Sequence, residues 1–305
     1  MDRDGARVTR TVPVTVVVPT IGRERLLADC LRSLAAADPR PSEVLIVDQS
    51  DVRSAGRLVQ GLDLETRVIE LEAPGISHAL NTAMHQASHD FVLVTHDDCR
   101  VREDWIGNAH ELLADRPDVL FTGRVLPEGG SQGVPSTITL LAASEHRAEA
   151  RCNLLYPNNM AVSACRAIAI GGFDERFTVA AEDNDFCYRW LMSGSAVRYE
   201  PRMVVWHRDW RSPDDLRRLY RRYWSAQGEM YAKHLSRRDL RLVPSLVANL
   251  RSGVIGAARR RFGRRRHLVT APDFSYGALT HLPLGLLRGF RSRPVPPSGH
   301  GTPAP

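Results

Sequence analysis

Residues 14–18, VTVVV, restrict the possible folds of this chain more than any other segment, because all five are β-branched. A β-branched run without alternating polar residues is typical of a strand that is buried on both faces. The residues that follow are apolar at helical spacing, at Leu26, Leu27, Cys30, Leu31 and Leu34. A buried strand that leads directly into an amphipathic helix predicts an α/β fold.

The alternation of strands and helices continues through the first hundred residues. Apolar runs at 43–47, 67–71 and 91–94 predict three more strands, and residues 74–87 predict a helix. Strands that alternate with helices in this way form a mostly parallel sheet with helices on its faces.

The pattern is less regular in the next hundred residues. Between residues 118 and 150 it weakens into Gly- and Pro-rich connections. Strands are expected again at 159–165 and 197–206, and a helix at 182–193 that Gly194 ends.

The net charge of +6 hides an uneven distribution of charged residues. Residues 1–208 contain 22 arginines and 29 acidic residues, whereas residues 209–305 contain 19 basic and 6 acidic ones. Arginine-rich helices are predicted at 213–235 and from 239 to about 261, and residues 259–266 include six arginines. The surplus favours a partner rich in phosphate, or a solvated helix face.

Composition and charge together predict four segments. We expect an N-terminal arm at 1–12, an α/β domain at 13–208, a basic helical extension at 209–290 and a disordered tail at 291–305.

The cysteines and the N-terminus indicate the compartment. The chain has five cysteines, an odd number, and no CxxC pair, which argues against a disulfide framework and a cysteine-built zinc site. A signal-peptide core is lacking, and no uncharged stretch reaches the length of a membrane span. We therefore expect a cytoplasmic protein.

Several well-known phosphate and catalytic motifs are absent from the sequence. It contains no GxxxxGK[ST], no GxGxxG after a strand, no GxSxG elbow between a strand and a helix and no HExxH. Nucleotide binding through a glycine-rich phosphate cradle is therefore not expected.

Carboxylates follow two of the predicted strands. Asp97 and Asp98 come after the strand at 91–94, where ligands of open α/β sheets bind, and paired carboxylates suit Mg²⁺. The alternative is a solvated turn. Asp48 follows the strand at 43–47, where it either caps the strand end or accepts the N3–H of uracil or thymine.

The last chemically useful groups lie further along the chain. Glu182 and Asp183 open a predicted helix, where acids either cap backbone N–H groups or act as a general base. His207 follows the strand at 197–206 and is either a metal ligand or a structural histidine.

In order and context, these groups resemble the inverting family 2 glycosyltransferases of the GT-A fold, and within them bacterial cell-envelope or rhamnosyltransferase-like members. The resemblance spans about residues 13–208. It rests on an ordered set of short segments: VVPT (17–20), VDQS (47–50), PGISHALN (74–81), THDD (95–98), GGFDE (171–175) and ED (182–183). None is specific alone, whereas the ordered set is.

The resemblance implies a Rossmann-like GT-A sheet and a hexosyltransferase that moves a sugar from a UDP or dTDP donor to a hydroxyl of a glycan or lipid-linked acceptor. Asp98 would bind Mg²⁺ or Mn²⁺ with His207 as a further ligand, and Asp183 would be the base beside Glu182. The donor would be held by Pro19, Thr20, Asp48, Gln49, Asn81 and Asp97.

Three positions depart from the family pattern. His96 replaces the first metal-site acid, Gln49 replaces a second base-binding acid, and Leu80 replaces an arginine. A cation near the diphosphate is then expected from Arg23 or Arg25.

Two other functions stay open at this point. A nucleotidyltransferase would need a Gly-rich, Lys-bearing N-terminal loop, which is absent. A non-catalytic scaffold would use the basic extension to bind nucleic acid. An anionic membrane surface suits that extension better, because apolar residues such as Leu246, Val247, Leu250, Val254 and Ile255 accompany the arginines. The enzyme would then lie peripherally at the inner face of the membrane.

Overall fold

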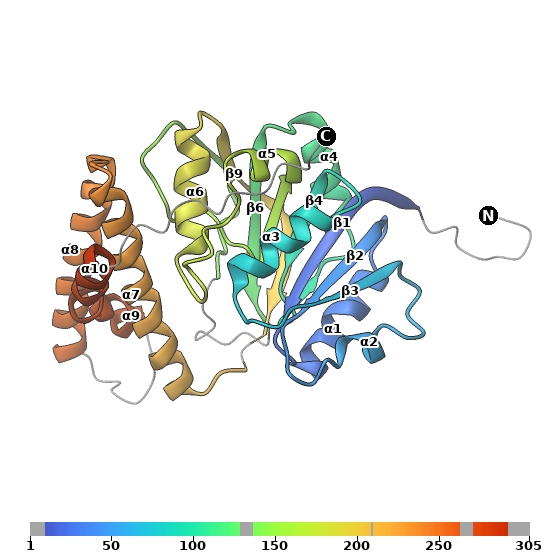
Figure 1. Ribbon diagram of the computed structural model, residues 1–305, viewed down its shortest axis with the longest axis horizontal. Helices are drawn as coiled ribbons and strands as arrows, with labels where there is room; N and C mark the ends of the chain where they lie inside the picture. Colours follow the sequence, from blue (N-terminus) through green and yellow to red (C-terminus); the bar gives the residue numbers. More distant parts are fainter. Residues whose placement is uncertain (1–9, 129–136, 209, 263–270, 292–305) are drawn as a thin grey trace, which may run out of the picture. The chain divides into compact units, whose positions relative to one another are not determined.

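The computed structural model describes residues 10–128, 137–208, 210–262 and 271–291 (Figure 1). The chain forms two compact units, which comprise residues 1–216 and 217–305. Most of the predicted arm at 1–12, nearly all of the tail at 291–305 and the arginines at 264–266 lie outside the described residues.

The first unit is built on one sheet, whose described strands run in the order β3-β2-β1-β4-β8-β6-β9-β5, with β7 paired to β9. One half of the sheet is parallel and contains β1 (Thr11–Thr20), β2 (Arg40–Asp48), β3 (Thr66–Glu70) and β4 (Phe91–Thr95). The other half contains β5 (Cys99–Val101), β6 (Val119–Pro127), β7 (Ser144–Arg147), β8 (Asn159–Ser163) and β9 (Ala196–His207). In that half only β6 and β9 are parallel among the described pairs.

Helices cover both faces of this sheet (Figure 1). Those of the first unit are α1 (Glu24–Ala35), α2 (Ala55–Leu58), α3 (Ile76–Gln86), α4 (Trp105–Asp115), α5 (Ala164–Ala169) and α6 (Glu182–Met192). Val16 and Val18 pack in the core with α1 and α4, whereas Val17 packs in the core with α3 and α6. The β-branched run is thus buried on both faces, and the predicted α/β class is confirmed.

Three details differ from the sequence-based expectations. The sheet is mixed, so the expectation of a mostly parallel sheet holds only for its first half. The strand predicted at 159–165 ends at Ser163, whose hydroxyl accepts a hydrogen bond from the Arg166 N–H and so caps α5.

The third difference is β6, which lies where only connections were expected. Gly123 and Arg124 interrupt its apolar pattern, and the pairing with β9 shifts register there. A Cβ atom at Gly123 would lie 2.4 Å from both the Asn159 amide and the Met203 carbonyl oxygen. The glycine is therefore required inside the sheet, although glycine is usually depleted in strands.

The described elements of the second unit are all helices, joined by short turns. α7 (Pro213–Ser236) contains the boundary between the units and is followed by a short 3₁₀ turn, η2 (Leu240–Leu242), and by α8 (Val243–Phe262), α9 (Ala271–Thr280) and α10 (Leu282–Arg291). α7 and α10 pack closely, because a Cβ atom at Gly285 would lie 1.9 Å from the Ser225 carbonyl oxygen. No helix among the described residues is both long enough and apolar enough to cross a bilayer.

Candidate active site

Three parallel strands deliver polar residues to the same edge of the sheet. β1 ends at Thr20 and β2 at Asp48, and these two residues are register partners. β4 ends at Thr95, two residues before Asp97. Because β1 lies between β2 and β4, side chains from all three ends meet at the edge where open α/β sheets bind ligands.

Asp97 is fully buried at this edge, and two residues near the end of β1 bind its carboxylate. The Thr20 hydroxyl donates to Oδ2 over 2.7 Å, and the Arg23 guanidinium donates to both oxygens. Burial raises the pKa of Asp97 above its ordinary value, with the charge of Arg23 opposing this shift and that of Asp98 adding to it. Asp97 is thus fixed by Thr20 and Arg23.

Asp98 has more partners than any other predicted site residue. Its Oδ2 atom accepts hydrogen bonds from Trp210 Nε1 at 2.8 Å and Arg23 Nη1 at 3.0 Å, and His207 Nε2 lies 3.4 Å away. Burial opposes ionisation, but the hydrogen bond and charge of His207, with the charge of Arg23, hold the pKa of Asp98 well below its ordinary value. Asp98 is therefore an ionised carboxylate.

Asp98, Cys99 and His207 offer ligand atoms that all lie within 4.8 Å of one another. The antiparallel pairing of β5 and β9 sets Cys99 opposite His207 and so brings His207 beside Asp98. Burial raises the pKa of Cys99 well above its ordinary value, so this group stays a thiol. A carboxylate and an imidazole remain as donors, and both suit a divalent cation such as Mn²⁺.

His96 stands next to this group in an unusual state. Its Nε2 atom is shielded from solvent and has no hydrogen-bond partner in the described residues. Burial, with the charge of Arg23 adding to its effect, lowers the pKa of His96 to about 4, although Asp98 opposes the shift. A neutral imidazole with an unsatisfied buried nitrogen fits a site that takes a polar ligand.

The residues at the end of β2 are held by the protein itself. Asp48 Oδ1 accepts from the backbone N–H of Ser50 at 2.9 Å and from its hydroxyl at 2.6 Å, and Oδ2 accepts from the N–H of Ala55 at 3.2 Å. Gln49 Oε1 accepts from the Gly75 N–H at 2.6 Å. Asp48 therefore caps the strand end, and a contact with the nucleotide base stays a prediction for Asp48 and Gln49.

Glu182 and Asp183 form a second group, in the first turn of α6. Burial and the charge of Asp183 raise the pKa of Glu182 well above its ordinary value, and Glu182 Oε2 has no partner in the described residues. Burial raises the pKa of Asp183 to about 6, and its Oδ1 accepts from the Asn184 N–H at 2.7 Å. Both carboxyl groups therefore hold a proton more readily than exposed acids do, and Asp183 can exchange its proton near neutral pH, as an acid–base site needs.

With this geometry described, comparison with known proteins identifies the family. A model described as "Glycosyl transferase family 2" matches residues 15–174, more than half of the chain. The chain belongs to this family. The family and the relatives named as glycosyltransferases favour this activity over the nucleotidyltransferase and scaffold alternatives.

Relatives of this glycosyltransferase are similar in sequence and in structure. The Pre-mycofactocin glycosyltransferase of Mycobacterium tuberculosis is 27% identical over 214 residues, which are 65% of this chain and 44% of that protein. The chain thus spans less than half the length of this relative. Mannosyltransferase PcManGT from Pyrobaculum calidifontis, solved with GDP-Man and Mn²⁺, is 18% identical with a TM-score of 0.62 over 90% of this chain and 86% of that one. Staphylococcus aureus TarS 1–349, solved with UDP, has a TM-score of 0.55 at 18% identity over 92% and 89% of the two chains. These likenesses confirm the GT-A fold.

Some residues of the glycosyltransferase site carried little signal in its sequence. Arg23 was one of two candidates for a diphosphate cation, and it binds the acid pair, whereas Arg25 is exposed. Trp210 and Arg211 follow β9. The only sequence signal for these two residues is that an aromatic residue lies close to arginines. Burial and the charge of Asp183 raise the pKa of Tyr156, which places this phenol near the predicted base.

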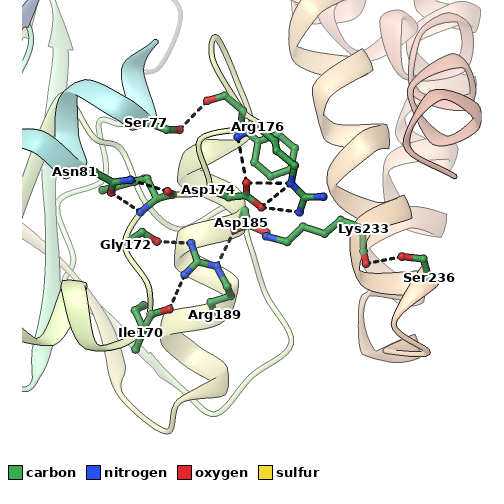
Figure 2. A network of polar contacts seen from close by, with 12 residues as sticks. Ser77, Asn81, Ile170, Gly172, Asp174, Arg176, Asp185, Arg189, Lys233 and Ser236 are labelled. Atoms are coloured by element: carbon green, nitrogen blue, oxygen red, sulfur yellow. Dashed lines mark hydrogen bonds and ion pairs between the residues drawn. The ribbon is translucent and has the colours of Figure 1, made fainter. Parts of the chain in front are cut away.

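Asn81 serves the turn before α6. Its amide accepts from the Phe173 N–H at 2.8 Å and donates to the Phe173 carbonyl and to Glu175 at 2.9 Å. Figure 2 shows this contact and, beside it, Arg189 reaching the carbonyl oxygens of Ile170 and Gly172. The described contacts hold Asn81 in a structural position, and a contact with the donor stays a prediction.

Proposed function

We propose that this glycosyltransferase moves a hexosyl group from a UDP or dTDP donor to an acceptor hydroxyl with inversion at the anomeric carbon. The observation that carries the proposal is the buried group of Asp97, Asp98 and His207 at the ligand-binding edge of the sheet. Asp98 and His207 would hold the divalent cation, Mg²⁺ or Mn²⁺. When bound, the cation supplies positive charge that stabilises the developing charge of the leaving nucleoside diphosphate.

The fit of a cation rests on the donor chemistry. Asp98 is ionised, His207 Nε2 is 3.4 Å from its carboxylate, and both side chains are buried. Solved proteins of the same fold support this part of the proposal, since PcManGT and GalNAc-T7 are each described with Mn²⁺.

Asp183 is the proposed general base. Its carboxylate is ionised above pH 6 and keeps partial exposure, so it can receive the proton of an acceptor hydroxyl. Glu182 lies beside it, and burial with the charge of Asp183 raises the pKa of Glu182, which favours its protonated, hydrogen-bond-donating form. The acceptor oxygen attacks the anomeric carbon as the bond to the diphosphate breaks. One displacement of this kind inverts the anomeric carbon.

The proposed donor-binding residues are Pro19, Thr20, Asp48, Gln49, Asn81 and Asp97. Thr20 acts through Asp97, which it holds by a hydrogen bond. Asp48 shapes the end of β2 and would accept the N3–H of uracil or thymine, a proton that cytosine lacks.

A thermal-shift panel tests this proposal. UDP- and dTDP-sugars with Mn²⁺ should raise the melting temperature by mass action, and cytidine and guanosine analogues should raise it less. Equal shifts for all nucleotides would contradict the assignment of Asp48, and no shift with any of them would contradict the proposed donor class.

The second unit supports a proposed attachment to an anionic membrane surface. Four exposed apolar residues lie along α8, and we call them the α8 face: Val243, Val247, Val254 and Ile255. On an ideal helix, Arg251 falls on the same side and Arg259 borders it one turn beyond Ile255, and both arginines are exposed. Of the residues expected at a membrane surface, Leu246 and Leu250 are only partly exposed.

The chemistry of this face favours a lipid surface over nucleic acid. Residues 240–262 contain no acidic residue, so arginines would meet anionic headgroups without opposition. The exposed valines would enter the boundary between headgroups and acyl chains, as in interfacial amphipathic helices. A glycan or lipid-linked acceptor at the membrane would suit an enzyme attached in this way.

A further inference from the structure

The two acids proposed to serve cation and donor binding are already neutralised by the protein's own cations. Arg23 contacts both of them, through Nε and Nη2 to Asp97 and through Nη1 to Asp98. Arg211 lies 3.8 Å from Asp98 Oδ2. The oxygen that a divalent cation would use is therefore surrounded by nitrogen atoms of Arg23, Arg211, His207 and Trp210.

An indole ring holds the arginines in place. The guanidinium carbon of Arg23 lies 4.7 Å from the centre of the Trp210 ring, and that of Arg211 lies 4.3 Å from it. Both distances are within the range of cation–π contacts. Trp210 also donates its Nε1–H to Asp98, so one residue contacts the carboxylate and both arginines. We call Arg23, Trp210 and Arg211 the arginine clamp.

Charge decides what must happen when a divalent cation binds. Like charges repel, and the repulsion is stronger in a buried site than in water. A guanidinium that stays on Asp98 would therefore oppose binding of the divalent cation to the same oxygen. Arg23 has the room to leave, because its side chain keeps 20% exposure.

We propose that Arg23 occupies the cation position of the metal-free enzyme and leaves Asp98 when a divalent cation binds. The freed guanidinium then pairs with the diphosphate of the donor, since its planar fork of N–H groups matches phosphate oxygens. Trp210 loses its hydrogen bond to Asp98 in the same event. This inference rests on the proposed metal site at Asp98.

The test measures binding of Mn²⁺ alone, by titration calorimetry and by the electron paramagnetic resonance signal of free Mn²⁺. Arg23→Gln should bind Mn²⁺ at least about tenfold more tightly than wild type, because a competing charge has been removed. The same variant should bind UDP about tenfold more weakly at saturating Mn²⁺, because a phosphate partner has been lost. Tighter binding of Mn²⁺ together with weaker binding of UDP would indicate that Arg23 and the divalent cation replace each other at Asp98.

Three further variants make the result interpretable. Arg23→Lys keeps the charge and should remain within about threefold of wild type for Mn²⁺. Arg25→Gln changes an exposed neighbour and should alter neither affinity. Trp210→Phe keeps the ring but removes the N–H donor, so it should also tighten Mn²⁺ binding, and it carries the test if Arg23→Gln does not fold.

Unchanged or weaker Mn²⁺ binding in Arg23→Gln and Trp210→Phe would overturn the inference while leaving the metal site in place. If neither wild type nor any clamp variant binds Mn²⁺, both the inference and the proposed metal site are wrong. Mn²⁺ binding that survives in Asp98→Ala would contradict the proposed site at Asp98 and, with it, the inference.

Discussion

Glu182 and Asp183 are adjacent carboxyl groups in one helical turn, and the charge of Asp183 adds to burial in raising the pKa of Glu182. The first turn of a helix ordinarily favours acidic charge. Here, burial outweighs that effect and raises the pKa of both groups. Of the two, Asp183 has a pKa of about 6, so this carboxyl group can take up and release a proton near neutral pH.

Replacing the proposed base should remove transfer while sparing donor binding. Asp183→Asn keeps the shape of the side chain but cannot take a proton, so turnover should fall about 10²–10⁴-fold. The rate of nucleoside diphosphate release in the presence of acceptor measures the loss, and calorimetry measures donor affinity. Asp51→Asn, at an exposed turn, is the control. Wild-type turnover in Asp183→Asn would show that another group is the base.

The rate of transfer should depend on pH through the same carboxyl group. Because the pKa of Asp183 is raised to about 6, turnover should rise with pH and reach half of its plateau near that value. One pH unit below the midpoint, the rate should be about tenfold lower. A pH–rate profile at saturating donor measures this, and a midpoint near pH 4 would contradict the assignment.

The raised pKa also makes Asp183 a source of instability. A carboxyl group with a raised pKa in the folded state gives full stability below its ordinary value of 3.8, and this contribution is lost as pH rises through about 6. Asp183→Asn has no carboxyl group that must ionise in the folded state. The free energy of unfolding of this variant should therefore exceed that of wild type by about 1–3 kcal/mol at pH 8. The gain should shrink as pH falls from 7 to 4. Urea unfolding across this range measures it, and a gain that grows toward acid pH would have the wrong sign.

Removing the proposed metal ligand should separate metal-dependent from metal-independent binding. Asp98→Ala should abolish the part of UDP affinity that depends on Mn²⁺, because the cation loses its carboxylate. Calorimetry with Mn²⁺ and with a chelator compares the two conditions. Asp104→Ala, an exposed acid before α4, should behave as wild type. Equal Mn²⁺ dependence in Asp98→Ala and wild type would show that the cation binds elsewhere.

The α8 face should mediate binding to anionic vesicles. Val247→Glu and Ile255→Glu each place a negative charge on this face, and either should reduce flotation with phosphatidylglycerol vesicles about tenfold. Leu141→Glu changes a still more exposed apolar residue of the first unit and serves as the control. Wild-type protein that does not float with anionic vesicles, or floats equally well with neutral ones, would contradict membrane attachment by charge.

Sequence reasoning found the strands and helices whose patterns are continuous. Residues 14–18 predicted the buried strand, and the carboxylates after β2 and β4 predicted which edge of the sheet bears the site. Strand β6 was not predicted, because Gly123 interrupts its apolar pattern. This glycine is required because Asn159 packs against it, and that contact forms only in the folded protein.

The contacts of the site were harder to predict than its position. Asp48 and Asn81 were expected to face the donor, whereas their described hydrogen bonds are to protein groups. The arginine clamp joins residues from the start of α1 with residues that follow β9, and no local pattern in the sequence links them. The contact of Arg23 with Trp210 and Arg211 depends on the order of the strands in the sheet.

The first turn of α3 is bound from two sides. The Gly75 N–H donates to Gln49 at the end of β2, while the Ser77 hydroxyl and the Ile76 N–H donate to the carbonyl oxygens of Phe177 and Thr178, shortly before α6 (Figure 2 shows Ser77). In the proposed function, a nucleotide that displaced Gln49 would therefore release a contact of the backbone that leads to α3 and, through Ser77 and Ile76, to the segment before Asp183. Binding of the donor would then be coupled to the position of the proposed base.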